Sequence, residues 1–227
     1  TETYGNTLYL LHLSTPEEFA LVDDAKKRGL HVFGELVGYQ LLFNTDDYAT
    51  YGNKIKVAPA LRSPQDQTEM WNRFRAGKID VICSEHTPHE WETKNQPDER
   101  KAQSGTPAIQ ENMSALITRF RKRFGANTTE KILLLLSKFG SEKPAQIFGL
   151  ETKGGLVIGK DADFSILNLA QPWTVKKEDL FTGCGWSSFE GMTFDGKPAA
   201  TFLRGKKVYE HGKILGEAQG KHLLRNV

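Results

Sequence analysis

The stretch IDVICSEHTPH, residues 79–89, decides how the whole chain is interpreted. Its first part is apolar and β-branched, so residues 79–86 are predicted to form a buried strand. Glu85, His86 and His89 end this stretch. A carboxylate there is costly unless it is paired or bound to a metal. The stretch therefore indicates either a metal and proton-transfer site or a polar turn at the end of a buried strand.

Strands and helices alternate on the N-terminal side of this stretch. Apolar runs predict strands at 7–14 and 31–37, and a shorter strand at 54–61. A capping residue followed by proline predicts that helices begin near the starts of residues 15–29 and 63–77. Such alternation predicts a parallel sheet with helical crossovers, an α/β fold. In these folds the chemistry lies at the C-terminal ends of the strands.

The pattern changes on the C-terminal side. Residues 90–104 are polar and aperiodic, which is typical of a mobile loop over the strand ends or of a solvated linker. Helical periodicity follows over residues 105–150. Glycine turns and a hairpin pattern at 199–215 then predict a small β module. The expected domains are 1–150 and 151–227.

Composition excludes several classes of function. The 227 residues carry a formal charge of +2, which gives no electrostatic reason to expect a nucleic-acid partner. No apolar run reaches the roughly 20 residues that a membrane span needs. Cys83 and Cys184 do not make a disulfide framework, so we expect a reducing, cytoplasmic location. The chain lacks a signal peptide and an initiator methionine, and we expect that the beginning of the protein is missing from it.

The predicted strand ends supply the candidate site residues. They are His12, Tyr39 just beyond the second strand, Ala58, and Glu85 with its neighbour His86. His12 and Glu85 could together bind a divalent cation such as zinc. A lone histidine at a strand end is more often structural, however, and catalytic zinc needs about three protein ligands. From the residues alone the signal for a metal site is weak.

The ordered motifs carry a family resemblance. They are LYLLHLST, GLHVFGELVGYQLLF, KVAPALRS, IDVICSEHTPH, SGTPAIQENMSALI, PAQIFGL, GGLVIGKDADFSILN and FEGMTFDGKPAATFLRGKKVYEHGKI. The chain resembles cyclic amidohydrolases, most closely the dihydroorotase branch, with allantoinases and hydantoinases near. The resemblance spans almost the whole chain but only the second half of the family's fold. It implies half of a (β/α)8 TIM-type barrel with a small appended β-sandwich module.

The resemblance also implies roles for single residues. His12 matches a metal ligand, and Glu85 stands where the family has an aspartate that binds metal and transfers protons. His89 matches a histidine that contacts the substrate. Gly105 and Thr106 lie in a loop whose backbone contacts the substrate ring. The implied reaction is zinc-assisted hydrolysis of a small cyclic amide, as in pyrimidine biosynthesis.

Three positions depart from the family pattern. Tyr39, or Gln40 if the alignment slips by one, stands in place of a metal-binding histidine. Ala58 replaces an asparagine that contacts substrate, and Glu85 is one methylene longer than aspartate. The family's remaining metal ligands lie upstream of the residues in this chain. We therefore expect zinc binding to be weak or absent.

Two hypotheses of different classes follow. The protein is either an active hydrolase in which Glu85 takes a proton from water and returns it to the leaving nitrogen, or a non-catalytic relative that keeps the fold for assembly. In the second case an active amidohydrolase or aspartate transcarbamoylase could be the partner. We also expect a homo-oligomer or an enzyme partner, and contact with the missing N-terminal half. The sequence leaves open whether the protein is an enzyme.

Overall fold

The computed structural model describes residues 1–223, which form two compact units. The first unit comprises Thr1–Leu116 and Val175–Met192, and the second comprises the other described residues. The domain division at residues 150 and 151 stays a prediction. Residues 224–227 of the predicted second domain lie outside the described residues.

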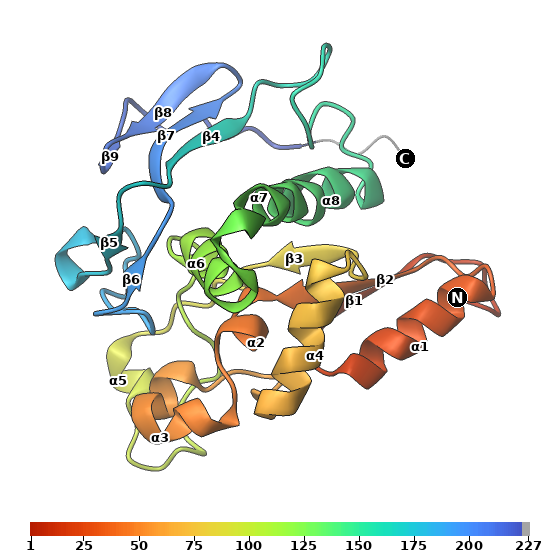
Figure 1. Ribbon diagram of the computed structural model, residues 1–227, viewed down its shortest axis with the longest axis horizontal. Coiled ribbons are helices and arrows are strands. Elements are labelled where there is room, and N and C mark those ends of the chain that lie inside the picture. The colour runs from red at the N-terminus through yellow and green to blue at the C-terminus, as the bar shows by residue number, and fades with distance from the viewer. Residues whose placement is uncertain (224–227) are drawn as a thin grey trace. The chain divides into compact units, whose positions relative to one another are not determined.

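A parallel sheet organises the first unit (Figure 1). Its strands, in spatial order, are β1 (Leu8–Leu13), β2 (Val32–Val37) and β3 (Val81–Cys83), and both pairings are parallel. The helices of this unit are α1 (Pro16–Lys27), α2 (Gly38–Leu42), α3 (Tyr48–Tyr51), α4 (Pro64–Arg75) and α5 (Trp91–Lys94). The predicted parallel arrangement is confirmed for these three strands.

The two long helices of this unit begin where the sequence predicts. The Thr15 side chain accepts from the backbone N–H of Glu18, whose carboxylate accepts from the N–H of Thr15. Ser63 and Asp66 form the same reciprocal capping box at the start of α4. A proline follows each cap, and its fixed φ suits the first helical turn. Residues within one helical turn of each other therefore determine where both helices begin.

One face of the sheet packs against α1. Gly34 in β2 lies on that face, where an added Cβ would stand 2.7 Å from Leu13 Cδ1 and 3.2 Å from Phe19 Cε1. Phe19 and Val22 of α1 are buried in the core. Since side chains alternate along a strand, Glu35 points to the opposite face. That second face carries the candidate site.

The predicted strand at 54–61 is wrong. Residues Gly52–Ile55 form a 3-10 helix, and the chain then runs irregularly to Leu61. The reason lies in the backbone partners. The Lys56 carbonyl accepts from the Gly105 N–H and from the Lys94 ammonium, 3.0 and 2.6 Å away. Pro59 also lacks the N–H that a central strand would need.

Helix α6 (Asn112–Phe124) runs from the first unit into the second. It begins later than the periodicity from residue 105 predicts. The second unit continues with α7 (Thr129–Ser137), a π-helix (Lys138–Glu142) and α8 (Lys143–Ile147). No described helix is long and apolar enough to cross a membrane, and a cytoplasmic location stays a prediction.

The remaining strands of the second unit are antiparallel. Strands β4 (Phe164–Asn168), β7 (Lys197–Leu203), β8 (Lys206–Glu210) and β9 (Lys213–Ile214) form one sheet in that order, and β5 (Trp173–Thr174) pairs with β6 (Thr193–Phe194). The sequence-predicted hairpin turns at Gly205 and Gly212 both have positive φ, 75° and 87°. The predicted hairpin at 199–215 is confirmed.

Candidate active site

Three strands bring polar side chains to the face of the sheet that lies opposite α1. Tyr9 comes from β1, Glu35 from β2 and Cys83 from β3. The Tyr9 hydroxyl donates to the Glu35 carboxylate over 2.8 Å. Burial raises the pKa of the Cys83 thiol, and the Glu35 charge raises it further, so this thiol stays protonated and unreactive. Glu35 thus lies at the centre of the face.

His12 lies in a β-bulge near the end of β1. Leu10 pairs with Gly34 but Leu13 pairs with Leu36, so two residues of β1 oppose the single residue Glu35. The φ of His12 is 42°, in the left-handed region that β-strand residues rarely adopt. Bulges of this kind often lie next to active sites, where they change the direction of a side chain.

Glu85 and Tyr39 meet beyond the ends of β3 and β2. Glu85 also has a positive φ, 44°. Tyr39 is buried in α2, and its hydroxyl donates a hydrogen bond to the Glu85 carboxylate. Burial raises the pKa of the Tyr39 phenol, and the hydrogen bond to Glu85 raises it further. Tyr39 is therefore a neutral donor to Glu85.

The two residues considered for this position have different partners. The Gln40 side chain donates to the carbonyls of Pro59 and Ala60, 3.2 and 3.4 Å away. Tyr39 alone of this pair contacts a predicted site residue. That Tyr39 rather than Gln40 stands in place of the family's metal-binding histidine stays a prediction.

The predicted metal residues His12, Tyr39 and Glu85 do not make a zinc site by themselves. No group of three histidine, cysteine, aspartate or glutamate side chains among residues 1–223 could hold a metal ion. A neutral phenol is a poor ligand, because it must lose its proton to bind metal well. The donor set of His12 and Glu85 is one short of the three protein ligands that catalytic zinc usually has. These residues alone do not fit the metal that the resemblance implies.

Beyond Glu85 the chain pairs with the segment around Gly105. The N–H of Thr87 donates to the Thr106 carbonyl over 3.1 Å, and the His89 Nε2 donates to the Ser104 carbonyl over 3.0 Å. His86 Nδ1 accepts from the N–H groups of Ala108 and Ile109, and burial lowers the His86 pKa. His86 thus holds the backbone of Ala108 and Ile109 through its Nδ1.

The predicted substrate contacts have partners of their own. The Gly105 N–H donates to the Lys56 carbonyl, the Thr106 N–H donates to the Thr87 hydroxyl, and the Thr106 hydroxyl bonds to the Ser188 hydroxyl. Ala58 is exposed in the irregular segment that precedes Pro59. Roles for His89, Gly105, Thr106 and Ala58 toward a substrate stay predictions.

Replacing Gly105 with alanine is expected to destabilise this loop. Its φ of 133° is open only to glycine, and an added Cβ would stand 2.6 Å from Thr87 Oγ1 and 2.7 Å from Thr87 Cβ. The free energy of unfolding should fall by about 2 kcal/mol or more. Urea unfolding checks this value. Gly183→Ala is the control, because a Cβ there meets nothing within 4 Å. An equal loss of unfolding free energy in both variants would contradict this account of Gly105.

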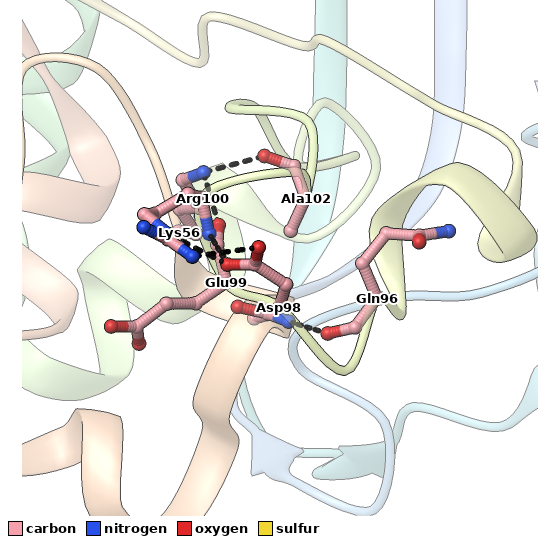
Figure 2. Close-up of polar contacts among 7 residues, drawn as sticks. Lys56, Gln96, Asp98, Glu99, Arg100 and Ala102 are labelled. Atoms are coloured by element: carbon pink, nitrogen blue, oxygen red, sulfur yellow. Dashed lines mark hydrogen bonds and ion pairs between the residues drawn. The ribbon is translucent and has the colours of Figure 1, made fainter.

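Residues 90–104 have their own anchors (Figure 2). The Lys56 ammonium donates to the carbonyls of Glu99 and Ala102, each at a distance of 2.6 Å, and the Asn53 side-chain amide donates to the carbonyl of Gln96. The Lys94 side chain is fully buried and donates to the carbonyls of Lys56 and Gln103. Contacts to residues 53–56 thus hold a segment that the sequence marks only as polar.

Comparisons with known proteins identify the family of this chain. Residues 4–208 match the sequence profile described as the Amidohydrolase family. The chain belongs to the amidohydrolase family. An allantoinase from Desulfitobacterium hafniense is 31% identical over 222 residues, which cover 98% of this chain and 48% of the relative. A dihydroorotase from Pyrococcus furiosus is 30% identical over 224 residues, covering 99% and 50%.

The fold of this amidohydrolase chain is also similar to solved structures. An L-hydantoinase from Arthrobacter aurescens matches with a TM-score of 0.88 and 32% identity, over 95% of this chain and 48% of that one. The chain thus spans about half the length of the relatives it matches. The expected resemblance to cyclic amidohydrolases is confirmed, as is its restriction to about half of them.

Sequence reasoning missed Glu35. It sits in the run VFGELV, where it is the only charged residue of an apolar strand. That isolation is a usable signal, because a partly buried carboxylate requires hydrogen-bond donors. The partners themselves, Tyr9 and the backbone of His12, lie 26 and 23 residues away and could not be inferred from the local pattern.

Proposed function

We propose that this chain forms half of a dihydroorotase-like barrel whose metal site has departed from the hydrolase pattern. In this proposal the protein keeps the amidohydrolase fold for assembly rather than for opening a cyclic amide ring. The observation that carries it is the hydrogen bond from the Tyr39 hydroxyl to the Glu85 carboxylate. The resemblance implies that the family holds metal at these two positions.

The chemistry of this pair opposes metal binding. The buried phenol stays neutral, so at this position it supplies a proton donor where a ligand is needed. A metal ion would have to compete with that donor for the Glu85 carboxylate. Glu85 is also one methylene longer than aspartate, and misplacement of a catalytic group by about 1 Å can lower a rate about a hundredfold.

The proposed partner is the other half of a barrel. Strands β1 and β3 each have one neighbour in the described sheet, and Leu8 and Leu11 of β1 are 39% and 55% exposed. A closed barrel has no such edges. The relatives are about twice as long as this chain, which supports a complementary half, whether continuous with it or separate. A second copy, an active amidohydrolase or aspartate transcarbamoylase are the alternative partners.

One observation favours an active hydrolase as the second candidate. Among the described non-glycine residues, positive φ occurs at His12 and Glu85 and at two residues near turns of the second unit, Arg204 and His211. Backbone strain of this kind clusters at active sites. In that case the Glu85 carboxylate, released from Tyr39, takes a proton from water and returns it to the leaving amide nitrogen.

Ring-opening assays discriminate between the two candidates. The purified full-length protein is tested with dihydroorotate, allantoin and hydantoin, with and without added zinc, beside a Glu85→Gln variant that lacks the proton acceptor. The proposal expects equal, background rates for both proteins on all three rings. A zinc-dependent rate that disappears in Glu85→Gln would establish the hydrolase instead.

A further inference from the structure

Glu35 has no role in the site described so far, although it contacts one of its members. We propose that Glu35 is a positioning residue that holds the β-bulge at His12 and thereby sets the direction of the His12 imidazole. Glu35 acts on the local geometry of His12, whether or not the site binds metal or turns over a substrate.

The strand register makes Glu35 the residue opposite the bulge. Leu10 pairs with Gly34, and the next pair is Leu13 with Leu36. Two residues of β1, Leu11 and His12, therefore lie opposite one residue of β2, Glu35. A bulge interrupts the ladder, so its backbone groups need other partners. The carboxylate of Glu35 is placed to supply one.

The contacts of Glu35 fit this function. Its Oε1 accepts from the backbone N–H of His12 over 3.3 Å, and its Oε2 accepts from the Tyr9 hydroxyl over 2.8 Å. Tyr9 thus fixes one oxygen while the other reaches the bulge. No ion pair to Glu35 occurs among the described residues, so hydrogen bonds alone hold its carboxylate in place. Hydrogen bonds to a charged acceptor are stronger than those to a neutral one.

Asp80 provides a matched comparison on the same sheet. Its carboxylate accepts from the backbone N–H of Gly34 over 2.8 Å and pairs with the Lys26 ammonium. Gly34 pairs in regular register with Leu10, and its side of the sheet faces α1. Loss of Asp80 should therefore weaken the sheet without changing His12.

The test follows His12 by NMR in the full chain. Backbone amide exchange of His12 and the imidazole ¹H–¹⁵N signals are recorded for the wild type, Glu35→Ala, Glu35→Gln and Asp80→Asn, and a His12→Gln variant assigns the signals. In Glu35→Ala we expect His12 amide exchange on the order of tenfold faster, with displaced imidazole signals. Glu35→Gln, which retains a neutral acceptor, should restore the exchange rate to within about threefold of the wild type.

Two results would overturn the proposal. One is unchanged His12 exchange and imidazole signals in Glu35→Ala; the other is an equal displacement of them in Asp80→Asn. If Glu35→Ala does not fold, Tyr9→Phe decides, because it removes only the hydroxyl that fixes the carboxylate. A displaced His12 imidazole signal in Tyr9→Phe supports the proposal, and an unchanged one contradicts it.

Discussion

Introducing the residues that the resemblance implies for the family at positions 39 and 85 is expected to tighten zinc binding by about 10- to 100-fold or more. The double variant Tyr39→His, Glu85→Asp replaces a neutral phenol with an imidazole and shortens the carboxylate. Even a residue that only orients a ligand is typically worth 10- to 100-fold in metal affinity, so a direct ligand should contribute at least as much. Competition titration with a chromophoric chelator measures the change.

The adjacent glutamine supplies the control for this experiment. Gln40 donates to the Pro59 and Ala60 carbonyls, so Gln40→His combined with Glu85→Asp adds the same imidazole beside the site rather than in it. That variant should bind zinc no more tightly than Glu85→Asp alone. An increase with Gln40→His and none with Tyr39→His would place the lost ligand at residue 40 and contradict the assignment.

Removing the buried ammonium of Lys94 is expected to lower the free energy of unfolding by about 3 kcal/mol near pH 8. Lys94→Met leaves the Gln103 carbonyl without its donor and takes one of two donors from the Lys56 carbonyl. Hydrogen bonds from a charged donor are worth about 1.5–3 kcal/mol each. Urea unfolding measures the loss. Lys101→Met, at an exposed lysine of the same segment, should change stability by less than about 0.5 kcal/mol.

The same lysine predicts a dependence of stability on pH. Burial lowers the Lys94 pKa from 10.5 to about 8, and the nearby Lys56 charge adds to this effect. Between these values Lys94 binds more protons in the unfolded chain than in the folded chain, so this lysine contributes a rise of stability with pH. The raised pKa values of Cys83 and Tyr39 act in the opposite direction, and both proteins share them. The slope of the wild type should therefore exceed that of Lys94→Met by up to about 1.4 kcal/mol per pH unit. An identical pH profile for the two proteins would contradict this account of Lys94.

Local signals explain what could be predicted from the sequence. The capping boxes at Thr15 and Ser63 each involve residues three apart, so the helix starts follow from short-range pattern. The parallel strands follow from apolar runs between such helices. The run KIKVAPAL, residues 54–61, shows where this reasoning fails. Its pattern suits a strand, but the Lys56 carbonyl is bound by Lys94 and Gly105, which local pattern does not reveal.

Part of the candidate site could likewise be predicted from local pattern, and part could not. The strand-end rule nominates His12, Tyr39 and Glu85, and the structure brings Tyr39 and Glu85 into contact across 46 residues of sequence. The motifs show only that a tyrosine stands at position 39. The structure adds that its hydroxyl donates to the Glu85 carboxylate. The isolation of Glu35 in an apolar strand marks it as unusual, but nothing local reveals that its carboxylate lies opposite a bulge.

The proposal depends most on the hydrogen-bonded pair of Tyr39 and Glu85, which is expected to keep zinc out of this site. Zinc content of the purified full-length protein, measured by mass spectrometry without added zinc and after dialysis against a chelator, tests it most directly. The account predicts far less than one zinc per chain. One tightly held zinc per chain, lost when His12 or Glu85 is replaced, would contradict it and favour the metal-dependent hydrolase.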